Sequence, residues 1–183
     1  MNEKELLERY ASGEKNFENM DLRGADLSGA TLLFVNLTGA NLNDCRLSGA
    51  NLTGARLRGA KLRGADLTCT SLVSANAIEA DFRGANLGGA NLSGAKLRKV
   101  NLNSAHLIGA NFRSANLNGA KLEYANMKGA RLKGANLSDA DLEGADLEGA
   151  NLIGAEIEGA KFTRVNLTRT IMPDGKLGTA IAT

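Results

Sequence analysis

Large apolar residues recur at every fifth position along most of the chain, with small or polar residues between them. From Asp81 to Ala160 this spacing runs for sixteen cycles without a slip. On an α-helix five residues advance by ~500°, so the leucines would form no continuous stripe. On a straight strand the side-chain period is two, so successive leucines would point to opposite faces. The spacing therefore excludes both a long amphipathic helix and a flat sheet.

One turn in every five-residue step, or pentad, resolves this conflict. Ala85 and Leu87 lie two residues apart and can face inward from one short extended segment, and a turn then directs Ala90 and Leu92 inward. Glycine stands two places after the large apolar residue in 18 of its 22 occurrences. Because the third residue of a type II turn needs a positive φ, which glycine adopts freely, this spacing predicts a turn in each pentad. A different or a strained turn is expected where another residue takes this place: Lys99, Ser104, Ser114, Tyr124 and Asp139.

The repeated string alanine, aspartate or asparagine, leucine resembles the pentapeptide-repeat family. Examples are Ala25–Leu27, Ala40–Leu42, Ala50–Leu52 and Ala135–Leu137. The likeness extends from Phe17 to at least Leu167. It implies an all-β fold, a right-handed quadrilateral parallel β-helix with four pentads per coil and about eight coils. The periodicity alone predicts a coil but does not choose the number of sides.

The first thirteen residues do not follow the five-residue pattern and predict a short capping α-helix. Asn2 is the expected N-cap and Gly13 the expected stop. The apolar face consists of Leu6, Leu7 and Tyr10. We expect this helix to cover the first coil and the outward apolar residues Leu33 and Phe34; a partner-binding helix, or a partner contact at Leu33 and Phe34, is the alternative.

The pattern is irregular at two further places. Ala77 stands where a leucine belongs, so either a small void forms or a bulge turns Ile78 inward, as a tolerated defect or as a functional kink. Beyond Leu167 the repeat fades, and Pro-Asp-Gly predicts a turn followed by a loose tail from residue 176. The predicted organisation is a capping helix (1–13), a β-helix (14–172), and a turn with a tail (173–183).

Composition agrees with a narrow, closed interior. Aromatic residues make up only 4% of the chain, there is no tryptophan, and the net charge is +2. Cys45 occupies an inward position and Cys69 a turn position, so we expect two free thiols and a reducing compartment. The chain shows no signal-peptide pattern and no long apolar run, so the expected location is cytoplasmic and no membrane contact is expected.

Charge is segregated along the chain, with a basic middle between two acidic ends. Residues 1–45, 46–135 and 136–183 carry net charges of −4, +10 and −4. In a four-sided coil eight cations of the middle segment lie on two neighbouring sides. We call them the basic waist: Arg56, Arg58, Lys61, Arg63, Arg83, Lys96, Arg98 and Lys99. Such a surface is either an ordinary solvated face or a contact surface for phosphates or for an acidic protein.

A second group of charges forms a candidate acidic patch near the other end. Its members are Asp139, Asp141, Glu143, Asp146 and Glu148. These carboxylates should point outward from successive sides and diverge, which disfavours a metal site. His106 has no carboxylate or thiol at a useful spacing, so the sequence predicts neither catalytic residues nor a cofactor.

The sequence therefore predicts a non-enzymatic scaffold that acts through protein–protein interaction on its outer sides. The expected assembly is a monomer or an end-to-end dimer. The alternative follows from the resemblance, since some family members protect DNA gyrase by imitating the shape and negative charge of DNA. The basic waist disfavours this alternative, and without aromatic residues between its cations it makes nucleic-acid binding the weaker expectation.

Overall fold

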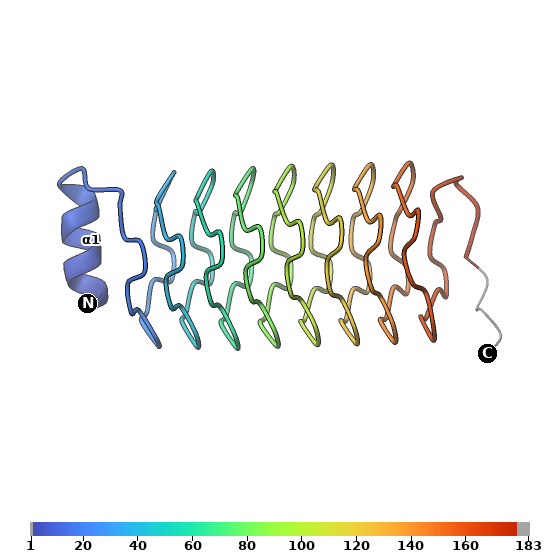
Figure 1. Ribbon diagram of the computed structural model, residues 1–183, viewed down its shortest axis with the longest axis horizontal. Helices are drawn as coiled ribbons and strands as arrows, with labels where there is room; N and C mark the ends of the chain where they lie inside the picture. The colour runs from blue at the N-terminus through green and yellow to red at the C-terminus, as the bar shows by residue number, and fades with distance from the viewer. Residues whose placement is uncertain (1, 179–183) are drawn as a thin grey trace.

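The computed structural model describes residues 2–178, in which one short helix precedes a rod of stacked coils (Figure 1). Parallel β-bridges join residues 20 apart along the rod, from the pair Asn16 and Asn36 to the pair Asn151 and Ile171. Four pentads therefore complete one coil. The bridges are isolated because each pentad contributes a single bridging residue before the chain turns.

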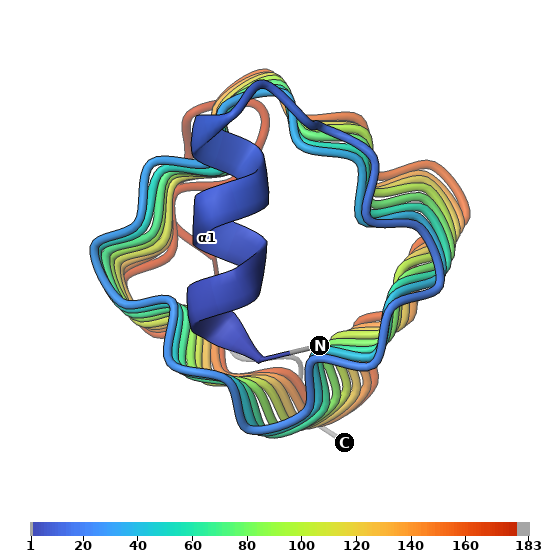
Figure 2. The ribbon, with the colours of Figure 1, turned by 90° about the vertical axis from the view of Figure 1, so that its left-hand side faces the viewer.

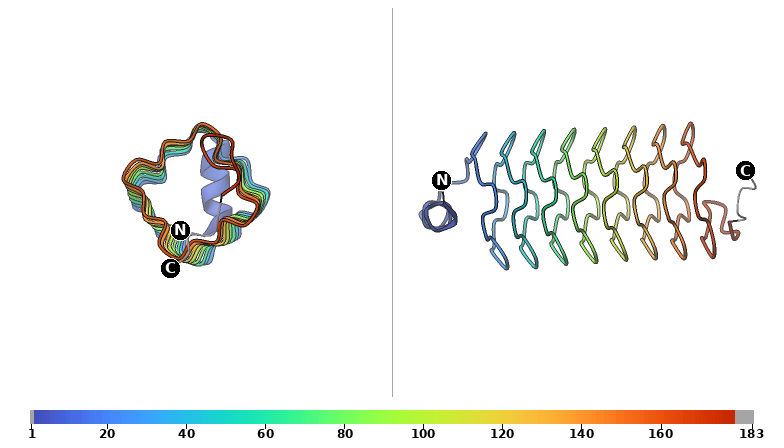
Figure 3. Two further views of the ribbon diagram at one scale, coloured as in Figure 1. Left: turned by 90° about the vertical axis from the view of Figure 1, so that its right-hand side faces the viewer. Right: turned by 90° about the horizontal axis from the view of Figure 1, so that it is seen from below.

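Pentads that lie 20 residues apart stack in four columns. The first column contains the pentads centred on Phe17, Leu37 and every twentieth residue after them; the second, third and fourth columns begin at Leu22, Leu27 and Leu32. Seen along the rod from either end, the coils superimpose on one closed outline (Figures 2 and 3). A residue on the outer surface therefore has its closest neighbours 20 positions away in the sequence.

Each pentad closes a β-turn and bonds to the next coil. The amide of Ala25 donates to the carbonyl of Leu22 within the turn, at 3.0 Å, and the amide of Leu22 donates to the carbonyl of Asn41, at 2.8 Å. The third turn residue has a φ between +54° and +69°, whether it is glycine, at 18 turns, or another residue, at 13 turns. For the non-glycine positions we expected either a different turn or a strained one, and the strained turn is correct because these residues keep the positive φ. The five residues named above all do so: Lys99, Ser104, Ser114, Tyr124 and Asp139.

The interior is filled by two side chains from each pentad, one large and one small. Leu87 and Leu92 are at most 1% exposed, as are the alanines two residues before them. In the described part of the rod three buried inward positions hold polar side chains, and each donates to the carbonyl of a leucine 23 residues earlier. These donors are Cys45, Thr70 and Thr170. Burial raises the pKa of the Cys45 thiol to about 11.

Helix α1 (Glu3–Ala11) crosses the mouth of the first coil (Figure 2). The Asn2 side chain caps it by accepting from the amide of Glu5 at 2.8 Å. Leu6 is fully buried and Tyr10 packs against the core. No helix in the described part of the chain has the length and hydropathy needed to cross a lipid bilayer.

Two expectations about this cap are wrong. Leu7 is 36% exposed, so it does not share the buried face with Leu6. Phe34 is 67% exposed, so α1 does not cover it, although the Tyr10 hydroxyl donates to the carbonyl of Leu33 at 3.1 Å. The helix therefore contacts the fourth column at Leu33 but leaves the ring of Phe34 exposed to solvent.

The coil continues without a bulge through the irregular pentad. The amide of Ala77 donates to the carbonyl of Lys96 at 2.9 Å, and the amide of Ala80 closes the turn on Ala77 at 3.1 Å. Ala77 is 1% exposed, while Ile78 keeps an outward position and is half-buried. The bulge that would turn Ile78 inward is therefore wrong, and the small void stays a prediction.

The rod ends in a hairpin instead of an immediate loose tail. The amide of Met172 donates to the carbonyl of Lys176 at 2.8 Å, and Ile171 forms an antiparallel bridge with Leu177. The amide of Gly178 then donates to the carbonyl of Thr170 at 2.7 Å. The tail predicted from residue 176 is thus paired as far as Gly178, and residues 179–183 lie outside the described part of the chain.

Candidate functional site

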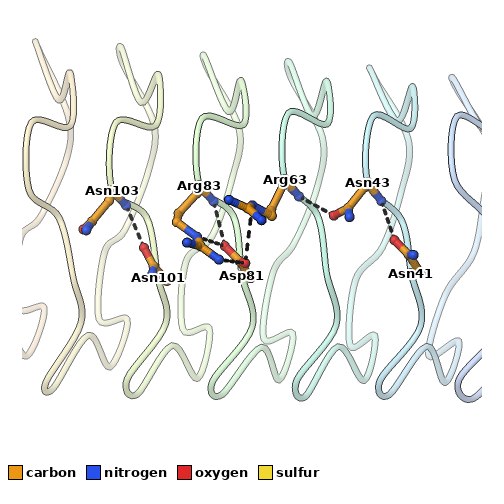
Figure 4. Close-up of polar contacts among 7 residues, drawn as sticks. All are labelled: Asn41, Asn43, Arg63, Asp81, Arg83, Asn101 and Asn103. Carbon is orange, nitrogen blue, oxygen red and sulfur yellow. Dashed lines mark hydrogen bonds and ion pairs between the residues drawn. The ribbon is translucent and has the colours of Figure 1, made fainter.

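In each pentad one outward side chain precedes the buried central residue and another follows it. Many of the preceding side chains support the turn. The carboxamide of Asn101 accepts from the amide of Asn103 at 3.1 Å, and Asn41 accepts from Asn43 in the same way at 3.3 Å (Figure 4). Successive coils repeat this arrangement at the strand spacing of ~4.8 Å. The outer surface is therefore a regular, firmly held ladder of side chains.

All eight residues of the basic waist are exposed, and they occupy two neighbouring columns. Asn76 bridges to both Arg56 and Lys96, so these two cations lie two coils apart with Asn76 between them. Asp81 bridges to Lys61 in the second column. The first column carries Arg56, Arg58, Lys96, Arg98 and Lys99; the second carries Lys61, Arg63 and Arg83.

Two carboxylates within the waist neutralise part of its charge. Asp81 accepts from Arg83 Nε and a terminal nitrogen, at 2.8 and 2.6 Å, and Arg63 approaches it at 3.8 Å (Figure 4). The hydrogen bond from Arg83 holds the pKa of Asp81 below its usual value. Glu79 lies 3.7 Å from Arg58. These three arginines are therefore partly neutralised by ion pairs on the protein itself.

Five cations of the waist form no ion pair with any carboxylate among residues 2–178. We call them the unpaired cations: Arg56, Lys61, Lys96, Arg98 and Lys99. Four of the five lie in the first column. This column therefore presents the strongest uncompensated positive charge of the waist.

The structure does not bring the acidic patch together. Asp141 pairs with Lys161 at 2.8 Å, and this contact lowers the pKa of Asp141. Lys128 lies 3.3 Å from Asp146 and 3.0 Å from Glu148. Glu143 pairs with Arg164, and Asp139 lies against Gly159 at a turn. No group of three or more His, Cys, Asp or Glu residues in the described chain could hold a metal ion.

Two exposed aromatic residues at turn positions share one arrangement that the sequence analysis did not predict. Phe34 and Tyr124 are 67% and 58% exposed and have φ values of 55° and 57°. Each ring lies over the glycine of the next coil, Gly54 or Gly144, where an added Cβ would come within 2.4 or 2.6 Å of ring carbons. The recurrence of aromatic and glycine at a spacing of 20 is the signal that could have revealed these contacts.

A family model of pentapeptide repeats matches this chain in eight copies. The matched stretches are 14–44, 32–68, 65–103, 78–113, 95–134 and 130–169. The chain belongs to the pentapeptide-repeat family. Solved structures of pentapeptide-repeat proteins resemble this chain, and this similarity identifies the fold as a right-handed β-helix solenoid. A comparison with curated proteins found no match.

Three of these solved structures illustrate the likeness. HetL from the cyanobacterium Nostoc sp. strain PCC 7120, a pentapeptide-repeat protein involved in heterocyst differentiation regulation, is 33% identical, with 97% of this chain and all of HetL covered and a TM-score of 0.50. A trypsin-treated form of QnrB1, a plasmid-mediated fluoroquinolone resistance protein, is 21% identical over 84% of this chain and 85% of its own, with a TM-score of 0.60. Rfr23 from the cyanobacterium Cyanothece 51142 is 37% identical over 53% and 63% of the two chains, with a TM-score of 0.42. The likeness to QnrB1 concerns the fold alone.

Proposed function

We propose that this pentapeptide-repeat protein is a non-enzymatic scaffold that binds an acidic protein surface through the unpaired cations of its basic waist. The observation that carries this proposal is that five exposed cations have no ion pair within the described residues 2–178, while neighbouring arginines are engaged by Asp81 and Glu79. Unpaired cations on a rigid surface attract an acidic partner and orient its approach. HetL is involved in heterocyst differentiation regulation, and by analogy we propose that the contact with the acidic protein is regulatory.

The proposed geometry of the interface follows from the stacking of pentads. We infer that the four columns form the flat sides of a right-handed quadrilateral β-helix of about eight coils. The first and second columns would then meet at an edge beside Lys99, and the unpaired cations would lie on both sides of it. A partner with a ridge of carboxylates at a repeat of ~4.8 Å would match this arrangement.

An association with DNA gyrase or nucleic acid is the weaker alternative. Imitation of DNA requires a continuous negative surface, whereas the carboxylates of the acidic patch are mostly paired with cations and the middle of the rod is basic. Phe34 lies beside Arg56 at one end of the waist, but a single exposed ring does not form the series of stacking surfaces that successive bases need. An acidic protein surface is therefore the better supported partner.

Two variants with equal changes in net charge test the proposal. Reversing Lys96 and Arg98 to glutamate should weaken the binding of a poly-glutamate peptide about tenfold, because it replaces two unpaired cations with repulsive charges. The control reverses Arg113 and Lys133, two exposed cations in the fourth column that form no ion pair among residues 2–178. This control should keep nearly the wild-type affinity, as measured by fluorescence anisotropy.

Two results would contradict the proposal. Equal losses of affinity in both variants would show that only net charge matters and not the waist. Tighter binding of duplex DNA than of the peptide, lost steeply as salt rises, would instead favour the nucleic-acid alternative, as would recovery of topoisomerase subunits with the tagged protein.

A further inference from the structure

A surface hollow lies beside the N-terminal end of the basic waist. It has a volume of about 380 Å³. Its lining consists of Lys15, Asn16, Phe34, Asn36, Gly54 and Arg56. Asn16, Asn36 and Arg56 are successive rungs of the first column, joined by parallel bridges. Phe34 and Gly54 stand at the turn that leads from the fourth column into the first.

The aromatic wall of the hollow is held against the coil beneath it. Phe17, Phe82 and Phe112 are fully buried, whereas Phe34 is 67% exposed. The ring of Phe34 occupies the space that a Cβ on Gly54 would fill, since Phe34 Cδ1 is 2.4 Å from that point. An aromatic side chain fixed in this way offers an apolar surface at little entropic cost to a ligand.

The two cations of the hollow are free to meet an anion. Lys15 Nζ lies 3.2 Å from the centroid of the Tyr10 ring, which α1 anchors by the hydrogen bond to Leu33. Neither Lys15 nor Arg56 forms an ion pair with a carboxylate among residues 2–178. The cap therefore holds a cation at one side of the phenyl ring, and the waist supplies another.

The side chain of Asn36 in the hollow is already engaged. Asn36 Nδ2 donates to Asn16 Oδ1 at 3.0 Å and to the carboxylate of Glu18 at 2.6 Å. Asn36 Oδ1 accepts from the amide and the hydroxyl of Thr38, at 3.2 and 2.7 Å. The donors and the acceptor of Asn36 are therefore used within the protein, and the phenyl ring and the two cations are the groups that we assign to ligand recognition.

We propose that this hollow receives an aromatic side chain flanked by carboxylates on the acidic partner of the basic waist. The inference rests on the proposed function, because Arg56 belongs to both the hollow and the unpaired cations. An aromatic ring would stack on Phe34, while carboxylates on either side of it would meet Lys15 and Arg56. The volume is at the lower end for ligand sites, which suits one anchoring side chain better than a cofactor.

The chain contains a matched control for this site. Tyr124 resembles Phe34 in exposure, in positive φ and in its position over a glycine, but it lies in the second column beside Glu143 and Arg164. Glycine is the usual residue at these turns and accepts the positive φ without strain. Phe34→Gly and Tyr124→Gly therefore remove one ring each while keeping a backbone that suits the turn.

The experiment compares two labelled acidic peptides that differ at one central residue, phenylalanine or serine, by fluorescence anisotropy with the full chain. The wild type should bind the phenylalanine peptide about five- to tenfold more tightly than the serine peptide. Phe34→Gly should bind the two peptides equally, and Tyr124→Gly should keep the wild-type preference. Phe34→Asn, which also tolerates a positive φ, should repeat the result of Phe34→Gly, and thermal unfolding checks that each variant is folded.

The outcomes separate this inference from the proposed function. If the wild type binds both peptides equally, or if Tyr124→Gly loses the preference as fully as Phe34→Gly does, the hollow is not the aromatic site, and the waist proposal stands. If the wild type binds neither peptide, both proposals are overturned. Reversal of Lys96 and Arg98 should weaken both peptides by the same factor and leave their ratio unchanged, because these residues lie outside the hollow.

Discussion

Replacing Leu92 by aspartate tests which positions of each pentad point inward, and every statement about the outer surface depends on this assignment. Leu92 is 1% exposed and shares the fourth column with Leu72 and Phe112, which are equally buried. Removing the leucine forfeits about 1.5–3 kcal/mol of burial, and placing an unpartnered carboxyl group there costs about 1–3 kcal/mol more. The free energy of unfolding should therefore fall by roughly 3–6 kcal/mol, a large part of the 5–15 kcal/mol typical of a folded domain.

The adjacent residue provides the control. Ser93 is the outward neighbour of Leu92 and is half-buried, and its backbone already bonds to Asn91 and Ser74. Ser93→Asp should change the free energy of unfolding by less than about 0.5 kcal/mol, because its side chain points outward and a carboxylate there can reach solvent. Urea unfolding followed by circular dichroism measures both variants. Equal losses of stability would refute the assignment of inward and outward positions.

The pH dependence of Leu92→Asp gives a second check on the same reasoning. A carboxyl group buried among apolar side chains has a raised pKa, because burial disfavours the charged form. Its folded pKa then lies above the unfolded value of about 3.9, so the protonated group is tolerated below that pH and the penalty grows as pH rises through the folded pKa. The stability gap between the variant and the wild type should therefore narrow in acid, and a gap that is constant with pH would argue that the aspartate is exposed.

Three further predictions concern the turns, the waist and the thiols. Gly109→Ala should cost about 1 kcal/mol in urea unfolding, because Gly109 has a φ of +65° and open space around its Cβ position; no loss would mean that the turn relaxes freely. Asp81→Asn should cost less than about 1 kcal/mol near neutral pH, and the difference should vanish as pH falls through the lowered pKa that the Arg83 hydrogen bond gives Asp81; a difference that persists in acid would contradict this ion pair. A thiol reagent should modify the exposed Cys69 in the native protein and Cys45 only after unfolding, since Cys45 is fully buried with a pKa of about 11, and equal rates would contradict that burial.

Much of the fold could be predicted because every pentad carries the same sequence signals for its inward positions and its turn. The inward positions follow from the spacing of alanine and leucine, and the turns follow from the glycines. The departures arise where tertiary contacts replace the repeat. Leu7 has the helical spacing of a buried residue, but the mouth of one narrow coil accepts only Leu6 and part of Tyr10. The pairing of Leu177 with Ile171 likewise depends on the end of the rod, which no local pattern indicates.

The surface was harder to predict because its neighbours are set by the coil and not by the sequence order. A charge count by segment gives the waist a surplus of cations, yet it does not tell which of them remain unpaired. Glu79 neutralises part of Arg58 from 21 positions away, and Asp81 reaches Arg63 from 18 positions away. Lys96, by contrast, has asparagines as its bridging neighbours on both sides.

Once a coil of 20 residues is established, the residues that stand beside each cation in the neighbouring coils can be read from the sequence. Arg56 and Lys96 have no acid 18 to 21 positions before or after them, whereas Arg58 and Arg63 each have one with which they pair. Lys61, Arg98 and Lys99 have Glu79 or Asp81 at such a spacing but form no ion pair among residues 2–178, because these two acids pair with other arginines.

An added acid that no other cation already holds, placed in the bridging position beside a waist cation, should therefore neutralise part of the charge of that cation. Asn116 bridges to Lys96, so Asn116→Asp should weaken acidic-peptide binding, whereas Asn136→Asp, one coil further along the same column, should leave it nearly unchanged. Equal effects of the two substitutions would show that the partner responds to the overall field of the rod and not to individual rungs of the ladder.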